Sequence, residues 1–311
     1  MRQKATLIFL SVMMVFGMIA AGCKGDMTFQ DLKTIMGTWD AANAERITLN
    51  GDTIGPPDLT MVAKDVDGNQ TEDLVFGGET GWLWGATNSS FTGISSSGNY
   101  IELRGASDSP VCPDQLIDAG SNSAAAIGDY DNDNNWELVI GNAAGEVFYG
   151  DVVSYNPVEL HMTYAQDVND GQTIMVPGGY AAPATGDVVG DELMDLVVGA
   201  GDGRLYVYEN VGTSDWPRVT YWGELSVDVG ERAAPVLKDL DGDGELELII
   251  GNAAGEIFAC DGIETACTNL GQYVEKNANP TVADFNHDGL WDLAIASGNG
   301  KAWLVPSVSE E

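Results

Sequence analysis

Positive charge is scarce in this chain of 311 residues. It has 13 Lys and Arg against 48 Asp and Glu, which gives a formal net charge of -35. Proteins bind nucleic acids and anionic membrane surfaces by neutralising phosphates with Lys and Arg. The composition therefore excludes nucleic acid as a natural partner and favours cations as ligands.

Several catalytic and metal-binding patterns are also missing. The sequence has no C-x-x-C pair, which argues against a zinc ribbon or a c-type haem, and no nucleophile elbow or phosphate-binding glycine loop. It has two histidines, His161 and His287, and a lone histidine in a turn is more often a surface residue than a catalyst. A non-enzymatic role is favoured. Cleavage of polysaccharide by a pair of carboxylates stays open as the alternative.

What the chain does have is enough apolar surface to fold. Hydrophobic residues make up 44% of it, with eight Trp, ten Tyr and eight Phe, which is a globular rather than a disordered composition. The acidic residues must therefore lie on or in a folded body.

The N-terminus has the features of an export signal. Arg2 and Lys4 precede an apolar run from Ala5 to Ala21, which Gly22 and Cys23 follow. We predict a signal peptide over residues 1–23, a linker with a short helix over 24–44, and a single domain over 45–311. No later run approaches the ~18 apolar residues that span a bilayer, so the rest is expected to be soluble and exported.

Three further cysteines follow the signal. Cys260 and Cys267, in CDGIETAC, are close enough in sequence to close a small loop in an oxidising compartment, whereas Cys112 is left over. The sequence alone does not decide whether that disulfide forms.

An acidic string recurs five times along the chain. The copies are DVDGNQTEDLVFGG, DYDNDNNWELVIGN, DVVGDELMDLVVGA, DLDGDGELELIIGN and DFNHDGLWDLAIAS, which begin at Asp65, Asp129, Asp187, Asp239 and Asp284. A short apolar run precedes each copy, and an apolar run, a glycine-rich turn and an aromatic segment follow it. This order predicts strand, acidic loop, strand, turn, strand. Starts that lie roughly 45 to 65 residues apart suit the blades of an all-β propeller.

Oxygen-bearing side chains fall at positions 1, 3, 5 and 9 of nearly every copy. Oxygens at alternate positions of a tight loop converge on one point and suit Ca²⁺. The candidate ligands are Asp65, Asp67, Asn69 and Asp73; Asp129, Asp131, Asp133 and Glu137; Asp187, Asp191 and Asp195; Asp239, Asp241, Asp243 and Glu247; and Asp284, Asn286, Asp288 and Asp292. In the third copy, Val189 and Glu192 replace the expected acid and glycine, so we expect that site to be weak or empty.

The loop of an EF-hand begins with the same pattern, D-x-D-x-D-G, but it needs a bidentate Glu at position 12 and a helix on each side. Position 12 is Ile250, Ile140 or Phe76 in the fourth, second and first copies. The EF-hand interpretation therefore fails.

The motif D-x-D-x-D-G-x-x-D-L followed by V-x-G resembles the FG-GAP and VCBS repeats, the blades of integrin-alpha-type β-propellers. The resemblance covers about Pro57 to Trp303. It implies Ca²⁺ in about four well-formed loops, with the carbonyl of Glu245 as a further ligand. It also implies a propeller, for which we expect five blades of four antiparallel strands.

The chain ends soon after the fifth copy, so the strand around Glu45 is expected to complete that blade. Six or seven blades, or completion of the ring in a dimer, are the alternatives.

The small-small-Cys ending of the signal resembles a bacterial lipobox, in which Cys23 carries the lipid. This implies an exported protein held at the outer membrane, cell surface or periplasm by its lipid alone, with a secreted protein as the alternative. The expected function is a Ca²⁺-stabilised interaction or adhesion module for a protein or glycan. An assembly scaffold is a further alternative. Among the tryptophans, Trp216 and Trp222 are the candidates for a ligand-facing surface, while Trp82, Trp84, Trp136, Trp291 and Trp303 are expected to pack between blades.

Overall fold

The computed structural model describes residues 45–47, 56–66, 73–86, 100–155, 158–212, 218–263, 265–285 and 288–307. The predicted signal, Cys23 and the predicted short helix lie outside these residues. The described residues form twenty strands and no helix, and so none that is long and apolar enough to cross a membrane. The prediction of an all-β protein is confirmed for this part of the chain.

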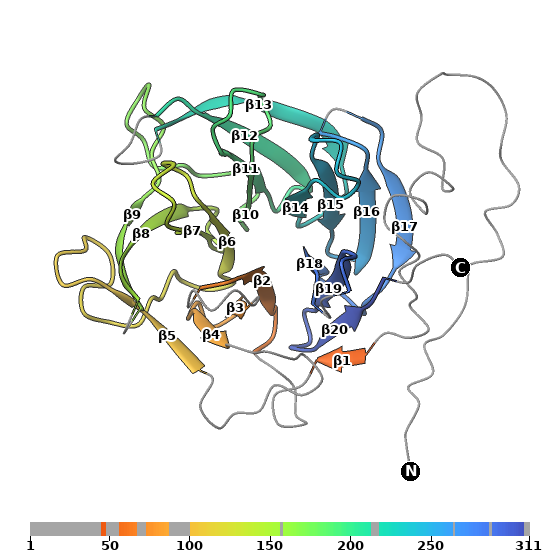
Figure 1. Ribbon diagram of the computed structural model, residues 1–311, viewed down its shortest axis with the longest axis horizontal. Helices are drawn as coiled ribbons and strands as arrows, with labels where there is room; N and C mark the ends of the chain where they lie inside the picture. The colour runs from red at the N-terminus through yellow and green to blue at the C-terminus, as the bar shows by residue number, and fades with distance from the viewer. Residues whose placement is uncertain are drawn as a thin grey trace, which may run out of the picture.

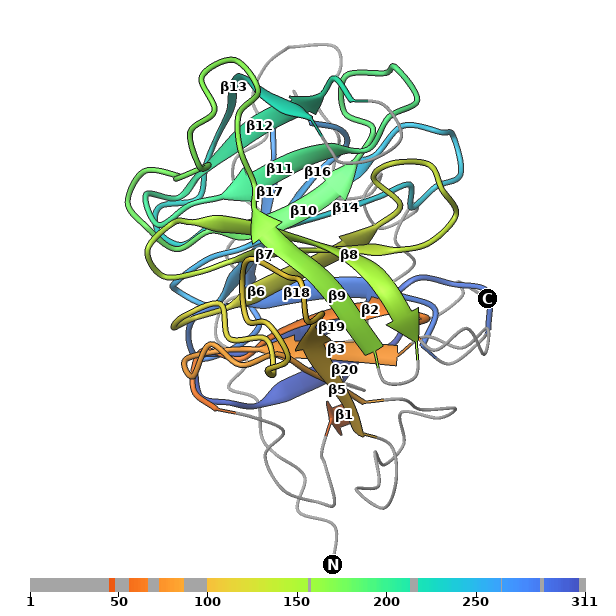
Figure 2. The same cartoon turned by 90° about the vertical axis from the view of Figure 1, so that its left-hand side faces the viewer.

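The strands form four-stranded antiparallel groups. The first group contains β2 (Thr60–Lys64), β3 (Asp73–Gly77), β4 (Trp84–Ala86) and β5 (Tyr100–Gly105). The second contains β6 (Ala124–Gly128), β7 (Glu137–Gly141), β8 (Val147–Tyr155) and β9 (Val158–Tyr164). Parallel pairing of β5 with β9 joins these two groups into one eight-stranded sheet, as the side view shows (Figure 2).

The other groups are separate four-stranded sheets. The third contains β10 (Ala182–Gly186), β11 (Asp195–Gly199), β12 (Arg204–Asn210) and β13 (Val219–Asp228). The fourth contains β14 (Ala234–Lys238), β15 (Glu247–Gly251), β16 (Glu256–Cys260) and β17 (Thr268–Gln272). The last contains β18 (Asn279–Ala283), β19 (Asp292–Ala296), β20 (Ala302–Val305) and, from the other end of the chain, β1 (Glu45–Ile47).

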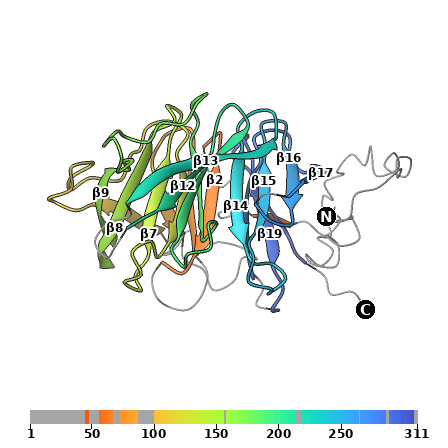
Figure 3. The same cartoon turned by 90° about the horizontal axis from the view of Figure 1, so that it is seen from above.

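The groups are arranged around a common axis. The first strand of each group, β2, β6, β10, β14 and β18, lies nearest the centre, and each contacts the first strands of the groups on either side (Figure 1). The view from above shows sheets standing side by side in a flattened body (Figure 3). This arrangement is propeller-like. The strand expected near Glu45 is present as β1, where it pairs antiparallel with β20.

The core lies between neighbouring groups rather than inside one. Five apolar clusters each join two groups, and the closing cluster brings Phe76 of β3 against Ala294 and Ala302 of the last group. The second strand of every group is buried along its whole length, because both of its faces are covered, and this explains its unbroken apolar run.

Glycine near the end of that strand allows neighbouring groups to approach. A Cβ on Gly199 would lie 2.2 Å from the carbonyl oxygen of Ala233, which precedes β14. A side chain at this position would push the two groups apart. The repeated V-x-G therefore serves packing between groups.

Most of the recurrent tryptophans pack as expected. Trp136 is buried in the cluster between the first two groups, Trp84 stacks on Phe76 at 4.3 Å, and Trp291 and Trp303 pack against the cluster between the last two. Trp82 differs, because half of its surface is exposed. It lies two residues before β4 and forms an isolated antiparallel bridge with Asp118.

Candidate metal centre

Each acidic loop joins the first strand of a group to the second. In the fourth loop, Asp239 accepts hydrogen bonds from the N–H of Gly242 at 2.7 Å and of Gly244 at 3.2 Å. Asp241 accepts from the N–H of Asp243 at 3.0 Å. These contacts hold the turn by local side-chain hydrogen bonds. Aspartates here therefore form the turn as well as presenting oxygens.

The sixth position of the loop adopts the predicted left-handed backbone. Gly244 has φ 93°, and Asn134 in the second loop has φ 67°. Asn tolerates this conformation better than most residues. Glu192 at the same position of the third loop has φ 71°, which costs a longer side chain about 1–2 kcal/mol. The loop thus keeps its shape even where its sequence departs from the pattern.

Two loops gather carboxylates closely enough to hold a cation. One oxygen from each of Asp129, Asp131 and Glu137 lies within 4.8 Å of the others, and the same holds for Asp239, Asp241 and Glu247. The position-9 glutamate is the buried member of each cluster, with 0% of Glu137 and 3% of Glu247 exposed. It begins the buried second strand, and its longer side chain reaches back to the loop.

One buried oxygen in the second loop has no partner among the described residues. Glu137 Oε2 accepts a hydrogen bond from the N–H of Tyr130 at 2.6 Å, whereas Oε1 is buried without a hydrogen bond. A buried carboxylate oxygen without a partner costs free energy that a bound cation would recover. The residues of this loop therefore fit a hard cation.

Electrostatics lead to the same conclusion. Burial, followed by the carboxylates of Asp131, Asp133 and Asp129, raises the pKa of Glu137 to about 8, although the Tyr130 N–H acts in the opposite direction. Burial and the carboxylates of Asp241, Asp243 and Asp239 raise the pKa of Glu247 in the same way. Without a cation, these glutamates are therefore harder to ionise than an ordinary carboxyl group.

The third and fifth loops, which have aspartate at position 9, are satisfied differently. Asp195 accepts hydrogen bonds from the N–H of Asn210 on one oxygen at 2.8 Å and from Val188 and Val189 on the other. Asp292 accepts from the N–H of Ser307 at 2.8 Å and of Phe285 at 3.1 Å. Both oxygens of each aspartate have protein donors. These residues turn toward the strand ends, and their loops form no cation cluster among the described residues.

The predicted ligands thus divide into two sets. Three predicted ligands come together in the second loop, Asp129, Asp131 and Glu137, and three in the fourth, Asp239, Asp241 and Glu247, whereas Asp133 and Asp243 are not part of these clusters. The third loop, which we expected to be weak, shows no cluster among its described residues. The fifth shows no cluster in its described part, from Asp284 to Phe285 and from Asp288 to Asp292, while Asn286 and His287 lie outside it. Asp67 and Asn69 of the first loop also lie outside the described residues, although Asp73 Oδ2 accepts from the N–H of Val66 at 3.0 Å.

The structure also brings together polar residues that the repeats did not single out. Residues two places before the first strands of the groups all have positive φ: Asp58, Asn122, Tyr180, Arg232 and Asn277. Their residue types differ from copy to copy, so no motif marked them. Four of them are in contact, because Arg232 pairs with Asp58 at 3.4 Å and lies over the ring of Tyr180 at 4.0 Å, and the side chain of Asn277 donates to Asp58.

Part of the chain matches the model of a known repeat family. Residues 187–250, from the third acidic loop to the end of the fourth repeat's buried run, match the model of the FG-GAP-like repeat. The chain carries an FG-GAP-like repeat. The match includes the third loop, which forms no cluster among its described residues, and the fourth loop, which forms one; the cluster of the second loop lies outside it.

Solved structures resemble the chain only loosely. BBS1N, solved in complex with ARL6DN, has a TM-score of 0.40 and 11% identity, covering 81% of this chain and 66% of the other. An N-acetylglucosamine-specific lectin from Agrocybe aegerita has a TM-score of 0.38 and 16% identity, covering 80% and 65%. Sqt1 from Saccharomyces cerevisiae has a TM-score of 0.38 and 10% identity, covering 83% and 60%. The chain spans less than two thirds of the length of these solved chains.

Proposed function

We propose that this protein is a Ca²⁺-stabilised β-propeller of five blades that acts as an interaction module. The FG-GAP-like repeat and the propeller-like fold suggest an interaction module. Support for five blades comes from the five four-stranded groups and from the contacts that join their first strands in a closed ring.

The observation that carries the cation proposal is the buried, unpartnered oxygen of Glu137 within a cluster of acids. All donors in the two clusters are carboxylate oxygens, which favours a hard cation such as Ca²⁺ over zinc. We assign Ca²⁺ first to the second and fourth loops. The cation's role is structural, because a ligand that binds only the folded state raises stability by mass action.

The proposed location and contact face rest on the sequence of residues 1–23 and on exposed aromatic side chains. We propose that residues 1–23 direct export and that Cys23 carries a lipid, which holds the domain of residues 45–311 at the cell envelope. The contact face we favour is the outer edge of the second and third groups, where Tyr164, Tyr221 and Trp222 are each between 43% and 47% exposed. A pocket of about 290 Å³ lined by His161 and Arg218 opens beside them. The predicted partner of Trp222, Trp216, lies outside the described residues.

The cation proposal is tested by thermal melting with and without a chelator. We expect EDTA to lower the melting temperature and added Ca²⁺ to restore it, and we expect the Glu137→Gln and Glu247→Gln double variant to lose this response. Asp195→Asn is the matched control, because its oxygens are satisfied by backbone N–H groups, and it should keep the response. Melting that chelation leaves unchanged would refute the structural role.

The interaction role is tested on the mature protein with a glycan array and analysis of products. Binding without turnover, weakened by Trp222→Ala and not by Trp82→Ala, supports the module. Turnover that is abolished by changing one carboxylate outside the acidic loops would instead establish the alternative, an enzyme acting on polysaccharide.

A further inference from the structure

An axial cavity of about 610 Å³ lies between the first strands of the groups, and residues of β2, β6, β10, β14 and β18 all line it. Figure 1 shows these five strands around the centre of the molecule. The volume is within the range of small-molecule sites, roughly 300–1,000 Å³. None of the described residues lines both this cavity and the pocket at the outer contact face. The two sites are therefore separate.

The wall of this cavity is built from the edges of strands. The lining residues of the first strands are consecutive in sequence, over 61–64, 125–128, 183–187, 235–239 and 280–282. Successive side chains of a strand point to opposite faces of its sheet, so a wall made by one face would include only every second residue. The backbone of the five strands therefore faces the cavity.

No further strand covers these inner edges in the described part of the chain. Each first strand lies at the end of its sheet and pairs only with the second strand of its group. Proline occupies the second position of β10, β14 and β18, as Pro183, Pro235 and Pro280. Proline is tolerated at a sheet edge, and it prevents pairing with a further strand. Three of the five edges are thus protected against another strand while they stay accessible to a small molecule.

One hydrogen bond shows what these edges can bind. The backbone N–H of Ala63 on β2 donates to the hydroxyl oxygen Thr281 Oγ1 on β18 at 3.3 Å, and both residues line the cavity. Carbonyls along the same edges accept hydrogen bonds, and a proline supplies a carbonyl without an N–H. A hydroxyl both donates and accepts. A ligand with several hydroxyls therefore matches this wall.

The charged side chains among the described lining residues are of both signs. They are Lys64, Lys238, Asp187 and Asp239. A charged ligand would lose its hydration without gaining a wall of the opposite sign, so an uncharged ligand is favoured. Asp239 also belongs to the cation cluster of the fourth loop. The cavity adjoins that loop, and a binding measurement has to keep Ca²⁺ constant.

We propose that the axial cavity binds an uncharged polyhydroxylated molecule of the size of a mono- or disaccharide. Its hydroxyls bond the backbone groups on the inner edges of the five first strands, and the volume of the cavity limits its size. This site goes beyond the interaction role of the outer face, because other residues form it.

The test is a titration followed by saturation-transfer NMR in a constant excess of Ca²⁺. The neutral probes are sorbitol, glucose and trehalose, and we expect saturable binding of at least one of them. Glucuronate adds a negative charge to glucose, and N-methylglucamine adds a positive charge to sorbitol. Each charged compound should compete for the site about threefold or more weakly than its neutral counterpart.

A variant that fills the cavity locates the site. Val236→Phe should weaken binding about tenfold or more, and Ala125→Phe replaces it if that variant fails to melt cooperatively. Val153→Phe is the matched control, because Val153 is 53% exposed on β8 and does not line the cavity. It should bind the probes as the native protein does.

Trp222→Ala separates this proposal from the interaction role, because it alters the outer face and should leave polyol binding unchanged. The proposal is overturned if none of the three neutral probes binds saturably, if a charged compound competes better than its neutral counterpart, or if the filled variant binds as the native protein does.

Discussion

At the residue scale, the length of one side chain separates two kinds of acidic loop. Glu137 and Glu247 reach the acids of their loops, whereas Asp195 and Asp292 are one methylene shorter and accept N–H groups from Asn210 and Ser307. The same position thus either closes a cation cluster or fixes a strand end.

This difference predicts unequal costs of removing loop acids. Asp241→Ala should lower stability in Ca²⁺ by about 2–3 kcal/mol, since it removes a ligand whose site contributes about 2.7 kcal/mol at a hundredfold excess of cation over Kd. Asp191→Ala in the third loop should cost under about 1 kcal/mol. Urea unfolding in Ca²⁺ measures both, and equal losses would contradict the assignment.

The raised pKa of Glu137 predicts that cation binding releases protons. Its folded pKa, about 8, lies above the ordinary 4.5, so in cation-free protein its contribution to stability is present below pH ~4.5 and is lost as the pH rises toward 8. A bound cation requires the ionised carboxylate of Glu137, so cation binding offsets this loss of stability and releases the proton. Calorimetric Ca²⁺ titrations at pH 7 in two buffers of different ionisation enthalpy should give different heats, and the difference should shrink at pH 9. Identical heats at pH 7 would disprove the coupling.

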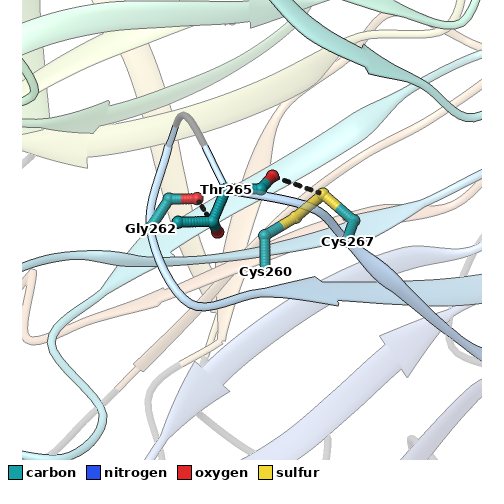
Figure 4. The surroundings of a disulfide bond; sticks show 4 residues. All are labelled: Cys260, Gly262, Thr265 and Cys267. Atoms are coloured by element: carbon teal, nitrogen blue, oxygen red, sulfur yellow. Dashed lines mark hydrogen bonds between the residues drawn. A yellow bond between two sulfur atoms is a disulfide. The ribbon is translucent and has the colours of Figure 1, made fainter. Parts of the chain in front are cut away.

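At the element scale, the outer strand β17 is held by one neighbour and by a covalent link. It is half-exposed and pairs with β16, and a disulfide joins Cys260 at the end of β16 to Cys267 just before β17 (Figure 4). The disulfide that the sequence left open is therefore formed, and Cys112 is free.

Removing this link should loosen the hairpin. The double variant Cys260→Ala, Cys267→Ala should lower the free energy of unfolding by about 2 kcal/mol. The loss is modest for a disulfide, because closing a short loop removes less entropy from the unfolded chain than closing a long one. Cys112→Ser serves as the control, and both variants are compared by melting under non-reducing conditions. A loss no greater than that of the control would show that backbone pairing alone holds β17.

At the scale of the whole molecule, strand β1 completes the last group. It pairs with β20 through Glu45 with Leu304, Arg46 with Trp303 and Ile47 with Ala302. Figure 1 shows the first strand of the chain beside the last. Without β1, β20 would present an unpaired edge.

Truncation tests this closure. A chain beginning after residue 50 should melt roughly 5 °C below one beginning after residue 40, since about 2 kcal/mol of lost pairing shifts the melting temperature by about 2–4 °C per kcal/mol in a chain of this size. It should also aggregate more readily. Equal melting temperatures would mean that the ring is held without β1.

Much of the fold and part of the site were predictable from local chemistry. The acidic turns depend on aspartate side chains that bond N–H groups two to five residues ahead, as Asp239 does, so alternate acids and a glycine predict them. The order of the strands followed from the turns and the apolar runs, and the fully buried second strands correspond to these runs. The sequence by itself determined the repeating unit, its loops and the identity of the candidate ligands.

Tertiary structure decided which of these features act together. Whether the carboxylate at position 9 needs a cation depends on whether a backbone N–H donates to it. Every residue except proline carries such a group, so the sequence does not mark Asn210 or Ser307 as the donor. The contacts of Arg232 with Asp58 and Tyr180 join turns far apart in the chain. No local pattern specifies such contacts, because they exist only once the groups have closed around the axis.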